Sequence, residues 1–177
     1  MQVNIIDSTN RVNRKNPFLQ FNQEQRMSIY RVEKTELPVV IFQADGSVMK
    51  GVVFLSASAY SHMGRQGLLD LLKEPGNFFP FRSESGAFCA ANKQTVTHIR
   101  FDPPEEGKAY QSLGDREDVE IKFVGGEQLS GTVTIEMPEG RKRLFDFINA
   151  TKSFFELHNQ EAHYLVNVTQ VRDISPL

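Results

Sequence analysis

Apolar residues occur along most of the chain in short runs separated by glycine, proline and polar residues, a pattern typical of β-strands. The runs 39–42 and 48–55 flank Asp45-Gly46, and two similar runs flank Gly125-Gly126. Residue pairs of this kind supply the positive φ angles of a type I′ turn. The pattern therefore predicts one β-hairpin near residue 45 and a second one near residue 125.

The stretch 39–99 resembles the stretch 119–174 in the order of its apolar and glycine residues. Gly51 corresponds to Gly131 in the two hairpins, and Asn92 corresponds to Asn167 near the end of each stretch. Between these positions both stretches contain Gly-Arg, then Asp, then Phe-Phe, an order that chance rarely repeats. We therefore predict a tandem duplication whose length differences fall in loops.

One short helix is expected in each copy. Leucines at positions 68, 71 and 72 have the spacing of a helix with one apolar face, as do the apolar residues at 144, 147 and 148. Pro75-Gly76 ends the first helix. Further strands are expected at 78–81, 88–92 and 96–99 in the first copy, and at 154–157, 164–167 and 171–174 in the second.

The fold class predicted from these elements is mainly β, with the order β-β-α-β-β-β in each copy. Strands this short do not bury a face as an open sheet alone, so we expect two small barrel-like units packed together. Gly51 and Gly131 lie inside predicted strands. Glycine at such a place marks a bulge or a strong bend, which a small barrel needs in order to close.

Four segments follow from this pattern. They are an N-terminal arm at 1–37, partly mobile, a first β-rich repeat at 38–101, a linker at 102–117 and a second repeat at 118–177. The start of the arm is polar, which favours mobility. The linker contains adjacent prolines and acidic residues, which favour an extended, solvated chain.

The composition is that of a soluble globular protein, with 40% hydrophobic and 24% charged residues. The formal net charge of −2 gives no support to a partner such as a phosphate backbone. Cys89 lies within an apolar run and is expected to be buried. No leader is recognisable and no stretch approaches the ~20 apolar residues of a membrane span, so we expect a cytoplasmic protein without a membrane partner.

The second copy contains the sequence Arg143-Leu144-Phe145-Asp146-Phe147-Ile148-Asn149, and the first copy has Gly67 and Lys73 in place of the terminal residues of this motif. The pattern resembles an uncharacterised group of bacterial domains with an Arg-Leu-x-Asp-x-Leu-Asn-like motif. The resemblance covers both copies but not residues 1–37. It implies a small Sm-like or SH3-like barrel, here duplicated, and no particular activity.

No recognisable catalytic site is present in the sequence. The patterns G-x-S-x-G, G-x-x-x-x-G-K-[ST] and G-x-G-x-x-G do not occur. Ser61-His62 are interpreted as solvated loop residues. His158, Glu161 and His163 lack the spacing that would aim all three at one metal ion, and we interpret them as polar residues of a hairpin loop. We therefore expect no enzyme, no cofactor and no metal site.

An arginine and an aspartate recur in both copies, as Arg65 with Asp70 and Arg141 with Asp146. One interpretation is a recognition site, in which arginine binds an anion. The other is a structural role, in which aspartate accepts backbone hydrogen bonds. The structural role is favoured. Apolar residues beyond those that a small barrel needs point to a contact with the other copy or a second chain; they are Leu69 and Phe145, off the apolar face of each predicted helix, and the pairs Phe78-Phe79 and Phe154-Phe155. The candidate interaction surface comprises Arg65, Leu69, Asp70, Arg141, Arg143, Phe145 and Asp146.

The leading functional hypothesis is a non-catalytic module for protein interaction or assembly, with a protein partner or self-association. Nucleic-acid binding through an Sm-like barrel is the alternative, although the basic clusters are confined to 141–143 and to Arg11, Arg14 and Lys15. A third hypothesis is a receptor for a cyclic dinucleotide of the PilZ type. Arg11-x-x-Arg14 and Asp45-x-Ser47-x-x-x-Gly51 each miss that family's motifs by one residue.

Overall fold

The computed structural model describes residues 34–56, 66–102, 114–138, 140, 143–160 and 162–177. These described residues belong to one compact unit. Its described part is mainly β, as predicted, with ten strands in one antiparallel sheet and two α-helices. Neither of these helices has the length and apolar character that a membrane crossing requires.

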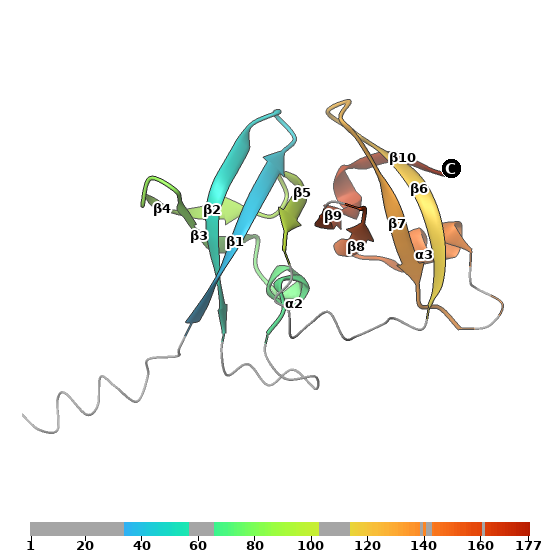
Figure 1. Cartoon of the computed structure of the whole chain (residues 1–177), viewed down its shortest axis with the longest axis horizontal. Helices are drawn as coiled ribbons and strands as arrows, with labels where there is room; N and C mark the ends of the chain where they lie inside the picture. The colour runs from blue at the N-terminus through green and yellow to red at the C-terminus, as the bar shows by residue number, and fades with distance from the viewer. Residues whose placement is uncertain (1–33, 57–65, 103–113, 139, 141–142, 161) are drawn as a thin grey trace, which may run out of the picture. The chain divides into compact units, whose positions relative to one another are not determined.

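The expected strands and helices are present in the expected order (Figure 1). The first half contains β1 (Lys34–Gln43), β2 (Val48–Ser56), α2 (Leu68–Lys73), β3 (Phe78–Ser83), β4 (Phe88–Asn92) and β5 (Val96–Phe101). The second half contains β6 (Asp115–Phe123), β7 (Gln128–Ile135), α3 (Leu144–Ala150), β8 (Phe154–His158), β9 (His163–Asn167), a 3-10 turn at Val168–Gln170 and β10 (Val171–Pro176). Strand β1 begins inside the expected arm and β6 inside the expected linker, because both extend the hairpin ladders with β2 and β7.

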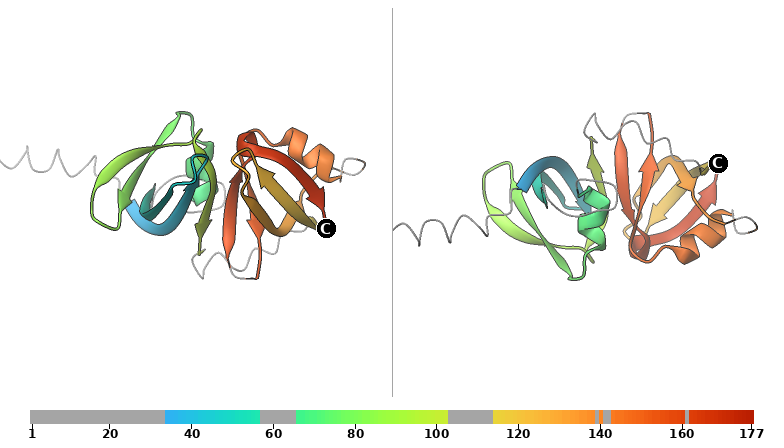
Figure 2. Two further views of the ribbon diagram at one scale, coloured as in Figure 1. Left: turned by 90° about the horizontal axis from the view of Figure 1, so that it is seen from above. Right: turned by 90° about the horizontal axis from the view of Figure 1, so that it is seen from below.

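The strands are arranged in the order β10-β6-β7-β8-β9-β5-β1-β2-β3-β4. In each half the last strand lies beside the first strand of that half, and β5 and β9 join the two halves. The sheet is not closed, so β4 and β10 are its edges in the described part of the chain. The two views of Figure 2 show that the strands of each half curve strongly around their own interior.

Two hydrophobic clusters fill the unit. The first contains β-strand residues such as Ile41 and Phe81 together with the buried leucines of α2. The second is built in the same way around Ile121 and Leu157. Two residues of the second half, Phe154 and Leu165, belong to the first cluster. The interior of the first half is therefore completed by β8 and β9.

The hairpin turns differ from the type I′ prediction. Gly46 has a φ of 82° and Gly126 a φ of 88°, but no residue other than glycine has a positive φ in the described part of the chain, so Asp45 does not adopt one. Gly46 N donates to Gln43 O at 2.9 Å, and Gln43 N donates to Ser47 O at 3.0 Å. This is a type I turn followed by a left-handed glycine, the usual three-residue hairpin loop.

The two strand glycines are needed for a close approach of neighbouring strands, and of the predicted bulge or bend, a bulge is absent at both. The ladder between β1 and β2 passes through Gly51 without a register shift, as the ladder between β6 and β7 passes through Gly131. A Cβ atom on Gly131 would lie 2.6 Å from His158 O, and one on Gly51 would overlap Arg82 O. Only glycine therefore lets β2 and β7 pair on both sides.

Replacement of Gly51 by alanine is expected to lower the free energy of unfolding by about 3 kcal/mol, because the new methyl group forces β3 away from β2. Urea unfolding followed by circular dichroism measures this change. Gly67→Ala is the matched control, since a Cβ atom there only approaches Asp70 Oδ2 at 3.4 Å. Equal stability of Gly51→Ala and the wild type would contradict the close approach.

Candidate interaction surface

The junction between the halves is an antiparallel pairing of β5 with β9, from His98 opposite Val166 to Phe101 opposite His163. Asn167 closes one end of it. Its Nδ2 atom donates to Lys93 O at 3.0 Å and to Val96 O at 2.9 Å, and its Oδ1 atom accepts a hydrogen bond from Thr169 N. All polar atoms of this buried amide are thereby used within the junction.

Lys93 connects the same end of the junction to helix α2. Its Nζ atom donates to Leu71 O at 3.2 Å and to Glu74 O at 2.8 Å, which are carbonyl groups at the C-terminal end of the helix. Positive charge stabilises this end of a helix, and the free carbonyls need donors. Burial lowers the pKa of Lys93, and the charge of Glu74 opposes that effect.

The outer face of β8 and β9 covers the first half. Phe154 is 4% exposed and Leu165 is fully buried, and both pack into the first cluster. Phe155 and Val166, which point to the other side of these strands, pack into the second cluster. Phe154 and Leu165 on one face of the β8–β9 pair are therefore buried by the first half, and Phe155 and Val166 on the other face by the second.

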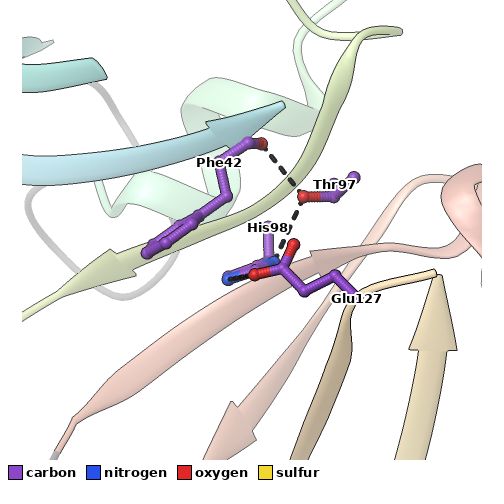
Figure 3. Close-up of polar contacts among 4 residues, drawn as sticks. All are labelled: Phe42, Thr97, His98 and Glu127. Atoms are coloured by element: carbon purple, nitrogen blue, oxygen red, sulfur yellow. Dashed lines mark hydrogen bonds and ion pairs between the residues drawn. The ribbon is translucent and has the colours of Figure 1, made fainter. Parts of the chain in front are cut away.

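His98 stands at one end of the junction, with 2% of its surface exposed. Its ring stacks on Phe42 at 4.2 Å and on Phe123 at 5.1 Å between ring centroids, and Tyr164 meets it edge-on. Figure 3 shows the polar contacts of the ring, which are to Thr97 and Glu127. Burial lowers the pKa of His98 to about 4, so the imidazole is neutral at pH 7.

The contacts of Thr97 determine which ring nitrogen of His98 carries the hydrogen. The Thr97 hydroxyl donates to Phe42 O at 3.1 Å, so it accepts the hydrogen bond from His98 Nδ1 at 3.2 Å. The unprotonated Nε2 atom then faces Glu127 Oε1 at 3.9 Å. Because the ring is neutral, this contact is not an ion pair at pH 7, and burial raises the pKa of Glu127.

The surface at the free edge strand β4 is exposed, in contrast to the buried junction. An outer stripe on β2, β3 and β4 comprises Phe54, Phe78, Pro80, Arg82, Phe88 and Ala90. Phe78 is 59% exposed and Phe88 is 69% exposed, although both stand in apolar strands. The prediction that Cys89 is buried was wrong, because β4 is an edge strand and nothing in the described chain covers this thiol.

Arg82 lies at the middle of the outer stripe. Its guanidinium carbon lies 5.5 Å from the ring centroid of Phe54 and 5.6 Å from that of Phe88, and these two rings stack at 5.7 Å. Glu36 accepts a hydrogen bond from Arg82 and neutralises its charge. The side chains of the stripe are therefore held in place before any partner binds.

The opposite edge of the unit, at β10 and α3, is also incompletely covered. Phe147, Ile148, Val171 and Ile174 pack against the second cluster but are only partly buried. Phe145 on α3 is 76% exposed. These residues form an end face, defined as Phe145, Phe147, Ile148, Val171 and Ile174, that has an apolar character and no strand beside it in the described chain.

Of the residues predicted as an interaction surface, the described ones lie on α2, on α3 and at the residue before α3. Asp70 accepts a hydrogen bond from Gly67 N at 2.9 Å, as the structural interpretation expects, and Leu69 is half-buried against the first cluster. Arg143 is exposed and its carbonyl accepts from Phe147 N at the start of α3, where Asp146 is half-buried. Arg65 and Arg141 lie outside the described residues, as do Ser61, His62, Arg11 and Arg14.

The histidines considered as metal ligands lie in strands and not in a loop as predicted. His158 and His163 face each other across β8 and β9, with 2.7 Å between their Nδ1 atoms, and His158 Nε2 lies 3.6 Å from Glu156. Glu161 is outside the described residues. The part of the chain that the structure describes holds no group of three side chains suited to a metal ion.

Sequence reasoning missed His98, and of the outer stripe it singled out Phe78 alone. The stripe had a signal in the sequence, because Phe78, Pro80 and Arg82 alternate with the buried Phe79 and Phe81 along β3. His98 had no such signal in the sequence, since its burial results from residues of three distant strands.

The buried neutral His98 is expected to make stability depend on pH. Its pKa in the folded protein is about 4, below the ordinary value of 6.5. As the pH falls, the unfolded chain therefore binds a proton at His98 before the folded protein does. The free energy of unfolding consequently decreases between about pH 6.5 and pH 4. The expected loss between pH 7.5 and pH 5 is about 2 kcal/mol by urea unfolding.

His98→Phe is the control for this effect, because it retains a ring between Phe42 and Phe123 without a titrating group. The variant is expected to lack the His98 part of the pH dependence, while other titrating groups contribute equally to both proteins. An NMR titration of the His98 ring gives an independent measurement. A pKa near 6.5 in the folded protein would contradict the prediction.

Comparison with known proteins gives no relative from which a role could be transferred. No family model, curated protein or solved structure matches the chain. Its function is therefore inferred from the surfaces described above.

Proposed function

We propose that the chain is a non-catalytic protein-interaction module that binds its partner through the outer stripe and the adjoining edge strand β4. The observation that carries the proposal is an apolar sheet edge with two phenylalanine side chains that are more than half exposed. Exposed apolar patches beside an unpaired strand are typical of protein-binding sites, because the partner gains both apolar burial and backbone hydrogen bonds.

The chemistry of β4 supports this role. Natural edge strands are usually protected against pairing by charged residues, proline or bulges. The sequence of β4, Phe88-Cys89-Ala90-Ala91-Asn92, contains no charge and no proline. The other edge strand, β10, contains Arg172, Asp173 and Pro176. An edge that carries no protection of this kind is suited to be covered by a partner.

A protein partner is favoured over a nucleic acid. Aromatic side chains such as Phe88 do stack on bases, but such sites also need positive charge that is available to phosphate groups. The arginine of the stripe, Arg82, is already paired with Glu36. The net charge of the chain is −2, so long-range attraction to a polyanion is lacking as well.

We also infer that the two halves are copies of one small barrel-like unit. Three local features recur at corresponding positions. The ladder skips Thr97 in β5 and Arg172 in β10, which places a bulge near the start of each last strand. Gly51 and Gly131 permit the same close approach of strands. The third feature is a turn in which asparagine Oδ1 accepts a backbone hydrogen bond two residues later, at Asn92 and at Asn167.

The binding role is tested by replacing Phe88 with the photo-reactive amino acid p-benzoylphenylalanine in the full chain, expressed in the cell that makes it. Irradiation is expected to give covalent adducts of discrete mass that mass spectrometry assigns to a protein. Ser130, an exposed position of β7, is the control site for the same label.

A second substitution, Phe78→Asp, is expected to reduce the yield of these adducts at least several-fold, because a buried charge opposes docking of the stripe. The midpoint of thermal unfolding should not change, since Phe78 is mostly exposed. The proposal is wrong if position 88 gives no more protein adduct than position 130.

A further inference from the structure

We propose that the partner is a second copy of this chain, bound head to tail, so that β4 and the outer stripe of one copy dock on β10 and the end face of the next. The inference rests on the proposed function and on the equivalence of the halves. It repeats between molecules the junction that β9 and β5 form within the molecule. The internal junction thus supplies the geometry of the external one.

The first argument is that the outer stripe contains the counterparts of the residues that seal the junction. Phe78 and Phe154 occupy the same position, opposite Asn92 and Asn167 respectively. Phe154 is 4% exposed because it enters the first cluster, whereas Phe78 is 59% exposed. Ala90 and Leu165 correspond in the same way, and only Leu165 is covered.

The second argument comes from the asparagines that end β4 and β9. Asn92 Oδ1 accepts from Gln94 N at 3.0 Å, and Asn167 Oδ1 accepts from Thr169 N at 3.1 Å, so the two amides are held alike. Asn167 Nδ2 then donates to two carbonyl groups across the junction. Within the described chain Asn92 Nδ2 donates no hydrogen bond. It lies at the edge where a second copy would present the counterparts of those two carbonyl groups.

The third argument concerns the receiving side. In the first half, β9 and β8 cover α2 and β5, and Leu72, Val96 and Ile99 are buried there. Their counterparts in the second half, Ile148, Val171 and Ile174, are only partly buried. The end face therefore corresponds to the site of the first half that β8 and β9 cover. On the end face no strands of the described chain take that place.

The register of the external pairing follows from the internal one. His98, Ile99 and Arg100 lie opposite Val166, Leu165 and Tyr164. Transferred to the counterparts, Asp173, Ile174 and Ser175 of one copy lie opposite Ala91, Ala90 and Cys89 of the next. Paired residues of antiparallel strands have Cα atoms about 4.5–5.5 Å apart, which is within the range of a disulfide bond.

The external pairing is expected to be weaker than the internal junction and reversible, because β10, unlike β4, carries charges and a proline that partly protect an edge strand against pairing. Asp173 takes the place of the stacked His98, and it is exposed and paired with the neighbouring Arg172. Partial loss of water from this charged pair opposes association. Because the contact joins two different surfaces, it leaves one free end on each side and continues to higher oligomers or closes into a ring.

The register is tested by Ser175→Cys in the full chain, which retains the native Cys89. Mild oxidation is expected to give a ladder of disulfide-linked dimers, trimers and larger species on a non-reducing gel. Arg172→Cys is the matched control, since its position on β10 lies away from Cys89 in the inferred register and should give no ladder. Removal of the native thiol by Cys89→Ala should also abolish the ladder of Ser175→Cys.

The surface is tested by sedimentation velocity of the unmodified full chain over a range of concentrations. The mean sedimentation coefficient is expected to rise with concentration for the wild type. Phe78→Glu and Asn92→Ala should each weaken association by roughly tenfold or more, as expected when a contact at the centre of an interface is removed. Phe78 is mostly exposed and Asn92 ends the edge strand β4, so the variants should remain folded.

The possible outcomes separate this inference from the proposed function. Cross-linked dimers that form through Cys89 alone and do not require Ser175→Cys would indicate pairing of two β4 strands, and would overturn the head-to-tail arrangement. A monomer at all concentrations, together with adducts of another protein at position 88, would overturn self-association but not the binding role. A monomer without any adduct at position 88 would overturn both.

Discussion

The pairing of β5 with β9 is the constraint on which the rest of the structure depends, because it joins two curved sheets into one. The pairing also brings Phe154 and Leu165 into the first cluster, so the first half does not have a complete interior of its own. His98 is buried by the same contact, which removes water from a ring that would otherwise be charged near pH 6. The completed first cluster and the neutral imidazole of His98 therefore both result from this strand pairing.

The elements of the fold could be predicted from the sequence because their signals are local. The spacing of Leu68, Leu71 and Leu72 places the helix, and turn residues bracket the strands. The position of a strand in the sheet is not a local property, so Cys89 in an apolar run gave no sign that β4 is an edge. The turn type also escaped prediction, because Asp-Gly fits a type I turn with a left-handed glycine as well as type I′.

The described candidate residues from the sequence lie on or next to the two helices, whereas the exposed Phe78 and Phe88 lie on strands. The aspartate of the first half, Asp70, accepts a hydrogen bond from the backbone of Gly67, which fits a structural role. The apolar residues that the fold leaves over lie on β3 and β4 at one edge and on α3 and β10 at the other. Phe145, which was singled out from the sequence, is part of the second of these faces.

Lys93 has a consequence for how motion passes through the molecule. Its ammonium group holds the last carbonyls of α2, and its own carbonyl is held by Asn167 of β9. Separation of β9 from β5 would release that carbonyl and, with it, the anchor of the helix end. Lys93 therefore links the end of α2 to the strand pair of the junction, so that opening of that pair loosens the helix end as well.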